Sequence, residues 1–211
     1  MPEVYPVPEL PDLARQADRL IDFGVHELAG VSATRLRAAA APEVPGSLLV
    51  LPAAPISKLA PLVELGGKHG FVVTDMSDVD EFAPIPSVRL PDSPAYRIET
   101  PDRGDDLAEC SPNEALSMIE AAGRTPLTLT EGLHWLLQCP DVLERNHCFM
   151  TIASRKHRLR GSPDARTPAI WISNGTGRDG AANRDAPKVG WCWAGNRHTW
   201  LGFASAAGRS G

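Results

Sequence analysis

Two helix-start signals in the middle of the chain constrain its fold more than any other feature. In "SPNEALSMIEAAGR", Ser111 precedes a proline and Glu114 stands three residues after it. In "TLTEGLHWLLQCP", Thr128 and Glu131 have the same spacing. In such a capping box the hydroxyl accepts from the third helical amide and the glutamate accepts from the cap amide, so both helices begin at fixed residues. The box also accounts for Glu131 without an acid–base role beside His134.

The part of the chain before these boxes predicts short helices and strands. Apolar residues recur at helical spacing in 12–24, and a second helix follows the N-cap Ser32 and ends at a proline. A third helix is expected over 55–67, where a pair of glycines ends it. The acidic run 75–81 predicts a solvated loop, with a cation site as the alternative. Short apolar runs predict buried strands at 47–53, 70–75 and 95–100.

From Cys148 onward the pattern changes to strands. Apolar runs at 148–154 and 167–173 flank a basic loop, and the segment 188–203 has Gly195-Asn196 as a two-residue turn. We therefore expect an α+β fold with a helical N-terminal part and a mixed sheet that includes an antiparallel C-terminal hairpin.

The expected hairpin places the tryptophans of "KVGWCWAGNRHTW" on one face. Counting outward from the turn pairs Trp191 with Trp200 and Trp193 with His198. Cys192 then lies on the opposite face from His198, which excludes a Cys–His nucleophile pair. The aromatic face is either part of the core or a platform on which a planar ring stacks.

The candidate site residues come from this face and from the basic loop. His198 is the best catalytic candidate because it is the one titratable group on the face; a satisfied core histidine is the alternative. Arginines of the loop suit a phosphate or carboxylate, with a solvated turn as the alternative. The expected ligand-binding residues are Trp191, Trp193, Asn196, His198, Trp200, Arg155 and Arg158.

Composition bounds the class of protein. The 211 residues suit one domain, and prolines keep residues 1–10 extended as an arm before a single domain at 11–211. A net charge of -5 argues against broad nucleic-acid binding. No run approaches the roughly 20 apolar residues of a membrane span, and the first residues lack the pattern of a signal peptide. We therefore expect a cytoplasmic protein with no membrane partner and with reduced cysteines.

The sequence predicts neither a cofactor nor a metal. The segment "GTGRDG" matches the dinucleotide fingerprint, but too few residues precede Pro187 to form the required helix, so a hairpin loop is the better interpretation. The cysteines and histidines between His134 and Cys148 do not have the spacing of a zinc site, and Pro140 interrupts them.

Several segments together resemble a known family. They are "GRTPLTLTEG", "CFMTIASR", "TPAIWIS" and "APKVGWCWAGNRHTWLG", and they resemble an uncharacterised family of actinobacterial proteins of unknown function. The resemblance covers roughly residues 10–207 and is densest after Ser111. It implies a bacterial cytosolic protein and implies no reaction. The chain departs from the family at "PDRGDDLAEC" and in "NGTGRDGAANRD", which is longer here.

Two functional hypotheses follow. The first is a small-molecule-binding protein, in one form a bacterial biosynthetic enzyme, acting on a planar or anionic metabolite with the C-terminal hairpin as a pocket wall. The alternative is a non-enzymatic interaction module that binds a protein or RNA through the basic loop 155–160 or the proline-rich arm. The sequence leaves open whether the protein is an enzyme and whether it forms a homo-oligomer.

The capping boxes predict stability effects. Ser111→Ala and Thr128→Ala should each lower the free energy of unfolding by about 1 kcal/mol, the usual contribution of an N-cap. Chemical denaturation measures this, with Ser117→Ala in the helix interior as a near-neutral control. If both cap variants are as stable as the control, the helices begin elsewhere.

Overall fold

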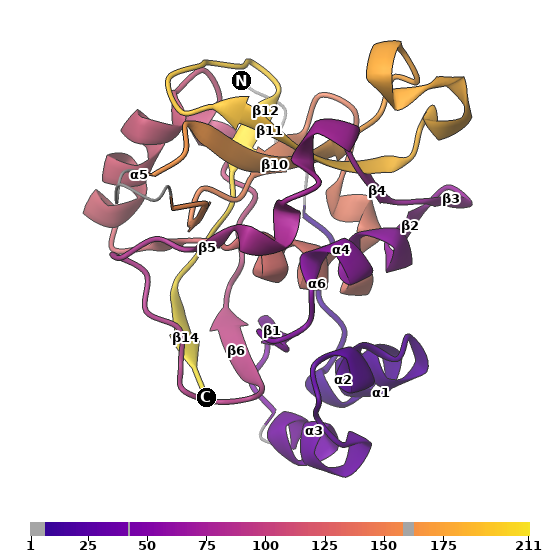
Figure 1. The fold of residues 1–211 in the computed structure, drawn as a ribbon. Helices are drawn as coiled ribbons and strands as arrows, with labels where there is room; N and C mark the ends of the chain where they lie inside the picture. Colours follow the sequence, from indigo (N-terminus) through magenta and orange to yellow (C-terminus); the bar gives the residue numbers. More distant parts are fainter. Residues whose placement is uncertain (1–6, 42, 158–162) are drawn as a thin grey trace.

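The chain has an α+β fold in the computed structural model, which describes residues 7–41, 43–157 and 163–211 (Figure 1). In these ranges the α-helices are α1 (Leu13–Asp22), α2 (Val25–Leu28), α3 (Ala33–Ala40), α4 (Ile56–Leu59), α5 (Pro112–Ala121) and α6 (Leu129–Gln138). The strands are β1 (Ser47–Val50), β2 (Glu64–Leu65), β3 (Lys68–His69), β4 (Phe71–Val72), β5 (Ala83–Pro84), β6 (Tyr96–Glu99), β7 (Thr125–Pro126), β8 (Cys148–Met150), β9 (Ser154–Arg155), β10 (Arg166–Ile172), β11 (Pro187–Trp193), β12 (Leu201–Phe203), β13 (Ser205–Ala206) and β14 (Gly208–Ser210).

Two sheets enclose a central helix. A five-stranded sheet has the order β12-β8-β10-β11-β4, and a three-stranded sheet has the order β1-β6-β14. Figure 1 shows α6 between these sheets, with α1, α2 and α3 grouped beyond β1. The predicted α+β class is confirmed, including a helical N-terminal part and a mixed sheet with an antiparallel hairpin.

Helix α6 is buried on every side. Nine of its ten residues are buried, which is the pattern of a helix inside a core rather than on a surface. Gly132 lets the helix approach the five-stranded sheet, because a Cβ atom there would lie 2.7 Å from Thr151 Cγ2. The polar side chains of α6 are therefore buried in the core, where each needs a hydrogen-bond partner.

The most consequential of these groups is Glu131, which has no exposed surface. Arg209 of β14 donates from Nε and Nη2 to the two carboxylate oxygens, at 2.6 and 2.8 Å. Tyr96 of β6 donates its hydroxyl at 2.8 Å, and the Thr128 amide donates at 2.7 Å. These bonds join α6 to β6, the central strand of the three-stranded sheet, and to β14, one of its edge strands.

The predicted helix starts are confirmed. Both capping boxes are complete, with Ser111 and Glu114 at the start of α5 and Thr128 and Glu131 at the start of α6. Ser32 caps α3 through a bond from the Arg35 amide. These signals work because each depends only on residues within one turn.

The prediction of one helix over 55–67 is wrong. The chain forms one turn of helix in α4, then a 3₁₀ turn at 60–62, and then β2. Pro61 explains the break, since proline removes a helical amide and clashes with the preceding turn. The two glycines that were expected to end the helix instead form the turn between β2 and β3, both with positive φ.

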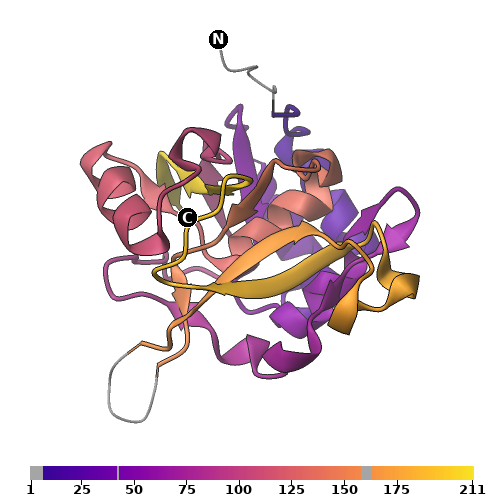
Figure 2. The ribbon, with the colours of Figure 1, turned by 90° about the horizontal axis from the view of Figure 1, so that it is seen from above.

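The hairpin expected over 188–203 is also wrong. Strand β11 pairs antiparallel with β10, from Pro187 opposite Ile172 to Trp193 opposite Arg166. Strand β12 pairs parallel with β8, on the other side of β10. The antiparallel C-terminal hairpin is therefore β10–β11, joined by the long segment 173–186 that projects at one end of the molecule in Figure 2.

The turn itself explains the different path. The Asn196 amide donates to Trp193 O, as a tight turn requires, but the chain does not fold back onto β11. Instead, the carbonyls of Ala194 and His198 accept from the amides of Asn113 and Glu109. These bonds attach the turn to the start of α5, so the residues after it reach β8 rather than β11.

The buried pair between Glu131 and Arg209 predicts a large stability effect. Arg209→Leu should lower the free energy of unfolding by about 3–5 kcal/mol, because it leaves a buried carboxylate without its counter-charge. Urea denaturation measures the loss. Arg15→Leu is the control, since Arg15 is 82% exposed in its ion pair with Asp12 and should leave stability nearly unchanged. A loss for Arg209→Leu no larger than the control's would refute the role of the pair.

Candidate functional site

The aromatic residues are divided between the two faces of the β10–β11 hairpin. Trp191 lies opposite Pro168, and Trp171 lies opposite Lys188. Side chains alternate along each strand, so Trp191 and Trp193 share one face, and Trp171 lies on the other. The single aromatic face expected from the sequence therefore does not form.

One group consists of Trp191 and Trp193. Their rings meet edge to face at 4.6 Å between centroids, and Trp193 is 48% exposed. Asn196 lies in the exposed turn beyond them. The predicted pairs of Trp191 with Trp200 and of Trp193 with His198 are wrong, because the two strands that would have carried them are not neighbours.

The second group consists of Trp171, Trp200 and His198. Trp200 meets Trp171 edge to face at 6.1 Å and His198 at 5.4 Å. Trp171 lies against Gly190, where an added Cβ would be 2.5 Å from its ring, and the Lys188 ammonium lies 4.6 Å from its centroid. Trp171 is thus held on two sides, and its contact with Trp200 forms an aromatic corner.

This corner is part of a pocket of about 260 Å³. The pocket combines two indoles with a guanidinium, two amides and a thiol, which suits a single planar ring system with polar edges. Its lining residues are Arg145, Asn146, Cys148, Trp171, Ile172, Asn174 and Trp200. Of the predicted site residues that the structure describes, Trp200 alone lines this pocket.

Arg145 at the rim is fixed by the segment that joins β10 to β11. Its guanidinium donates to Asn174 Oδ1 at 3.0 Å and pairs with Asp185. Farther along, Asp179 accepts from Ser173 Oγ at 2.7 Å and pairs with Lys188 at 2.7 Å. This is the "GTGRDG" segment, which forms short 3₁₀ turns instead of opening an α-helix.

The thiol of Cys148 at this pocket is not an activated nucleophile. Cys148 is 2% exposed, and burial raises the pKa of its thiol to about 11. A thiolate is the reactive form, so at neutral pH the side chain contributes a small apolar surface. Burial likewise raises the pKa of Cys192 to about 11, which leaves no activated Cys–His pair in that strand.

His198, the best catalytic candidate from the sequence, lies beside the pocket rather than in its lining. It is half-buried, and burial lowers the pKa of its ring. Its Nε2 atom is buried and has no hydrogen-bond partner in the part of the chain that the structure describes. Its ring supports Trp200 through the edge contact. His198 is therefore placed to position an indole rather than to touch a ligand.

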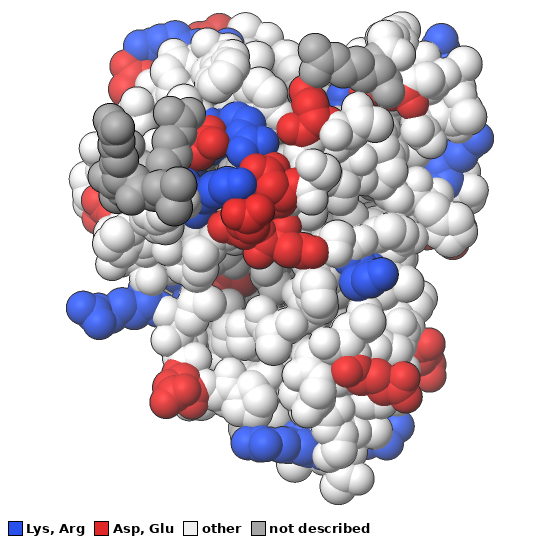
Figure 3. Space-filling view, in the orientation of Figure 1, with Lys and Arg blue, Asp and Glu red and all other residues white. Residues whose placement is uncertain are grey.

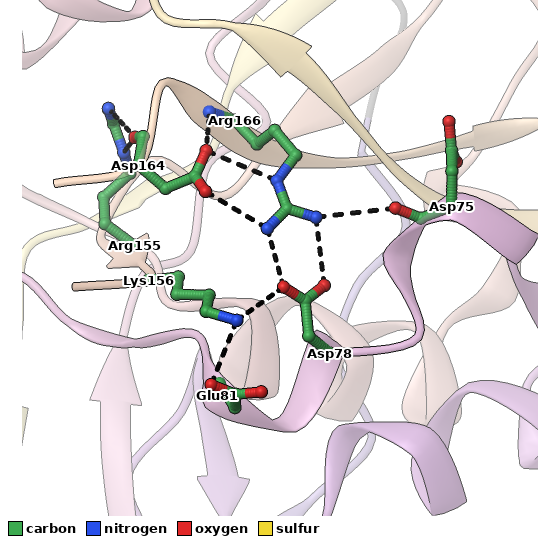
Figure 4. A network of polar contacts seen from close by, with 7 residues as sticks. All are labelled: Asp75, Asp78, Glu81, Arg155, Lys156, Asp164 and Arg166. Carbon is green, nitrogen blue, oxygen red and sulfur yellow. Dashed lines mark hydrogen bonds and ion pairs between the residues drawn. The ribbon is translucent and has the colours of Figure 1, made fainter. Parts of the chain in front are cut away.

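Arg155 and Lys156 of the basic loop already have partners in the structure. Arg155 donates to Asp164 O at 3.0 Å, and Lys156 pairs with Asp78 at 2.8 Å and with Glu81 at 3.0 Å. Arg166 bridges Asp78 and Asp164, and its hydrogen bonds hold the pKa of Asp78 far below its usual range (Figure 4). Figure 3 shows acidic and basic side chains gathered on this face. The structure thus places Lys156 in an ion-pair network and Arg155 against a backbone carbonyl, and the other predicted arginine, Arg158, lies outside the described residues.

Another buried histidine, His134 of α6, is also accounted for. Its Nε2 atom accepts from the Leu51 amide at 3.1 Å, and its Nδ1 atom lies 2.8 Å from Thr130 O. Burial lowers the pKa of His134 to about 4. The neutral ring thus links α6 to the chain after β1, as a structural side chain.

Six of the seven residues that line the aromatic pocket were not predicted as site residues from the sequence. Trp171 was assigned to a strand, but which tryptophan it would meet depends on the order of strands. Cys148 was seen only as one of several cysteines. Arg145 and Asn174 stand in loops 29 residues apart, so no local pattern could join them.

The described part of the chain contains no cluster of three or more histidine, cysteine or acidic side chains that could hold a metal ion. It also contains no helix with the length and apolar character required to cross a membrane.

Comparison with known proteins gives one match. The sequence profile of a family of unknown function, DUF5701, matches residues 19–211. The chain matches no curated protein and no solved structure.

The buried His134 predicts a pH dependence of stability. Its pKa is about 4 in the folded protein and near 6.5 in the unfolded chain. Between these values the unfolded chain binds more protons, so stability should fall as the pH falls, by about 1.4 kcal/mol per pH unit. Urea denaturation from pH 7 to pH 4 measures the slope, and His134→Gln should lower it. An unchanged slope in the variant would assign the effect to other groups.

Proposed function

Because the chain belongs to DUF5701, a family whose function is unknown, we propose its function from the site alone: it binds a small planar, anionic metabolite in the pocket of Trp171 and Trp200. A cytoplasmic protein of actinobacterial origin, as the sequence resemblance implies, is part of this proposal.

The observation that supports it is the aromatic corner. Trp171 and Trp200 both line the pocket, and their ring planes meet at 70°. A planar ring that stacks on one indole presents its edge to the other, which is the favoured arrangement of aromatic pairs. The pocket of about 260 Å³ suits one ring system of modest size.

The polar rim supports an anionic ligand. The Arg145 guanidinium offers donors in a planar fork that matches a carboxylate. Asn174 and Asp185 hold it at the pocket edge through one donor each, and its remaining N–H groups donate to no other residue in the described ranges. Asn146 and Asn174 add amide groups that can orient the ring edge.

The same pocket supports binding rather than thiol chemistry. Its nucleophilic side chain is Cys148, whose buried thiol stays protonated at neutral pH. The rival hypothesis is a non-enzymatic interaction module that uses the basic loop or the proline-rich arm. It has less support at the described loop residues, because Arg155 and Lys156 already have carbonyl or acidic partners.

Fluorescence titration tests the proposal. Benzoate, nicotinate and orotate serve as planar anionic probes, with benzamide as the neutral counterpart. At least one anionic probe should quench tryptophan fluorescence saturably, and Arg145→Gln should weaken its binding about tenfold by removing a charged hydrogen bond. Benzamide binding should be unaffected by that variant.

Two tryptophan variants provide the matched comparison. Trp200→Leu should abolish the saturable quench, since it removes one wall of the pocket. Trp193→Leu should preserve it, because Trp193 is exposed on the other face of the hairpin. Equal loss in both variants, or no saturable probe, would contradict the proposed site.

A further inference from the structure

A second and larger cavity lies at the start of α6. It has a volume of about 430 Å³ and lies between α6 and the segments 52–56 and 82–84. Three prolines, Phe82 and Leu90 give it apolar walls. On the face drawn in Figure 3, the surface is hollowed just below the mixed patch of charged side chains.

Two hydroxyl groups at the floor of this cavity accept hydrogen bonds but donate none to a described residue. Thr128 Oγ1 accepts from the Glu131 amide at 3.2 Å, and Ser154 Oγ accepts from the Leu129 amide at 2.9 Å. Both side chains are 2% exposed, and neither hydroxyl donates a hydrogen bond to any residue the structure describes. Buried hydroxyl protons without acceptors are rare in folded proteins. The floor therefore selects a ligand with acceptor atoms.

Thr130 adds a further hydroxyl group to the floor of the cavity. Thr130 lines the cavity, is only half-buried, and its hydroxyl has no partner among the described residues. Thr128, the N-cap of the ten-residue α6, and Thr130 in its first turn both line the cavity, and the amides of Leu129 and Glu131 already donate to the hydroxyls of Ser154 and Thr128. A carboxylate or carbonyl fits this end.

The mouth of the cavity has the opposite charge. Asp80 is exposed and lines the cavity, and its carboxylate accepts from the Ser57 amide and hydroxyl at 2.8 and 2.6 Å. No cation pairs with Asp80 in the described ranges, whereas the neighbouring Asp78 and Glu81 are paired with Lys156 (Figure 4). The negative charge of Asp80 is thus available to a ligand.

We propose that this cavity binds a small molecule with a carboxylate or carbonyl at one end and an ammonium group at the other, of which a neutral α-amino acid is the simplest example. The acceptor end lies against the hydroxyls of Thr128, Thr130 and Ser154. The ammonium lies near Asp80, and an apolar side chain contacts Phe82 and the prolines. This site is separate from the tryptophan pocket and does not depend on its occupation.

Calorimetry and thermal shift test the ligand class. L-leucine, L-valine, L-proline and the other neutral L-amino acids are the probes, each compared with its decarboxylated amine and its N-acetyl derivative. At least one amino acid should bind with a Kd below about 10 mM, and both derivatives should bind at least about tenfold more weakly. If no amino acid binds, or if the derivatives bind equally well, the proposal is wrong.

Variants assign the binding to this cavity. Thr130→Val removes a hydroxyl at constant shape, and Asp80→Asn removes the charge while keeping an acceptor for Ser57; each should weaken binding about tenfold. Asp92→Asn, an exposed carboxylate outside the lining, and Trp200→Leu in the other pocket should leave affinity unchanged. Should Asp80→Asn fail to fold, Thr130→Val decides. Unchanged affinity in the cavity variants, or loss in Trp200→Leu, would overturn the assignment.

Discussion

The buried carboxylate of Glu131 is the constraint on which the rest of the structure depends. An ionised group without exposed surface must be paired and hydrogen-bonded, or the fold loses several kcal/mol. Here Arg209, Tyr96 and the amide of Thr128 supply the partners. Because they come from two strands and from the helix cap, one side chain fixes the position of α6 against the three-stranded sheet. The cavity at the start of α6 is lined by residues of this helix and of β6, whereas the tryptophan pocket lies at the five-stranded sheet.

Helix α6 shows which features of the fold could be predicted from the sequence and which could not. Its start was predictable, since Thr128 and Glu131 lie within one turn and their mutual bonds need no other part of the chain. The residue that pairs with Glu131 could not be predicted from the sequence, because Arg209 lies 78 residues away. The α+β class was likewise predictable from local patterns, whereas the order of strands was not.

The C-terminal tryptophans show why strand pairing could not be predicted from local signals. A two-residue turn at Gly195-Asn196 was a sound local signal, yet pairing of β11 with β10 competes with pairing across that turn. Seven opposed residue pairs with β10 prevail, and two carbonyls of the turn accept from amides around the start of α5 instead. Trp200 was identified as a site residue, but its true neighbour, Trp171, comes from a different strand.

The position of Arg209 in the sequence has a consequence for biosynthesis. Helix α6 leaves the ribosome well before β14 does, since chains emerge from the N-terminus onward. Until β14 emerges, α6 has no counter-charge for Glu131, and the three-stranded sheet lacks one edge. The core around Glu131 is therefore completed only after translation has passed residue 209.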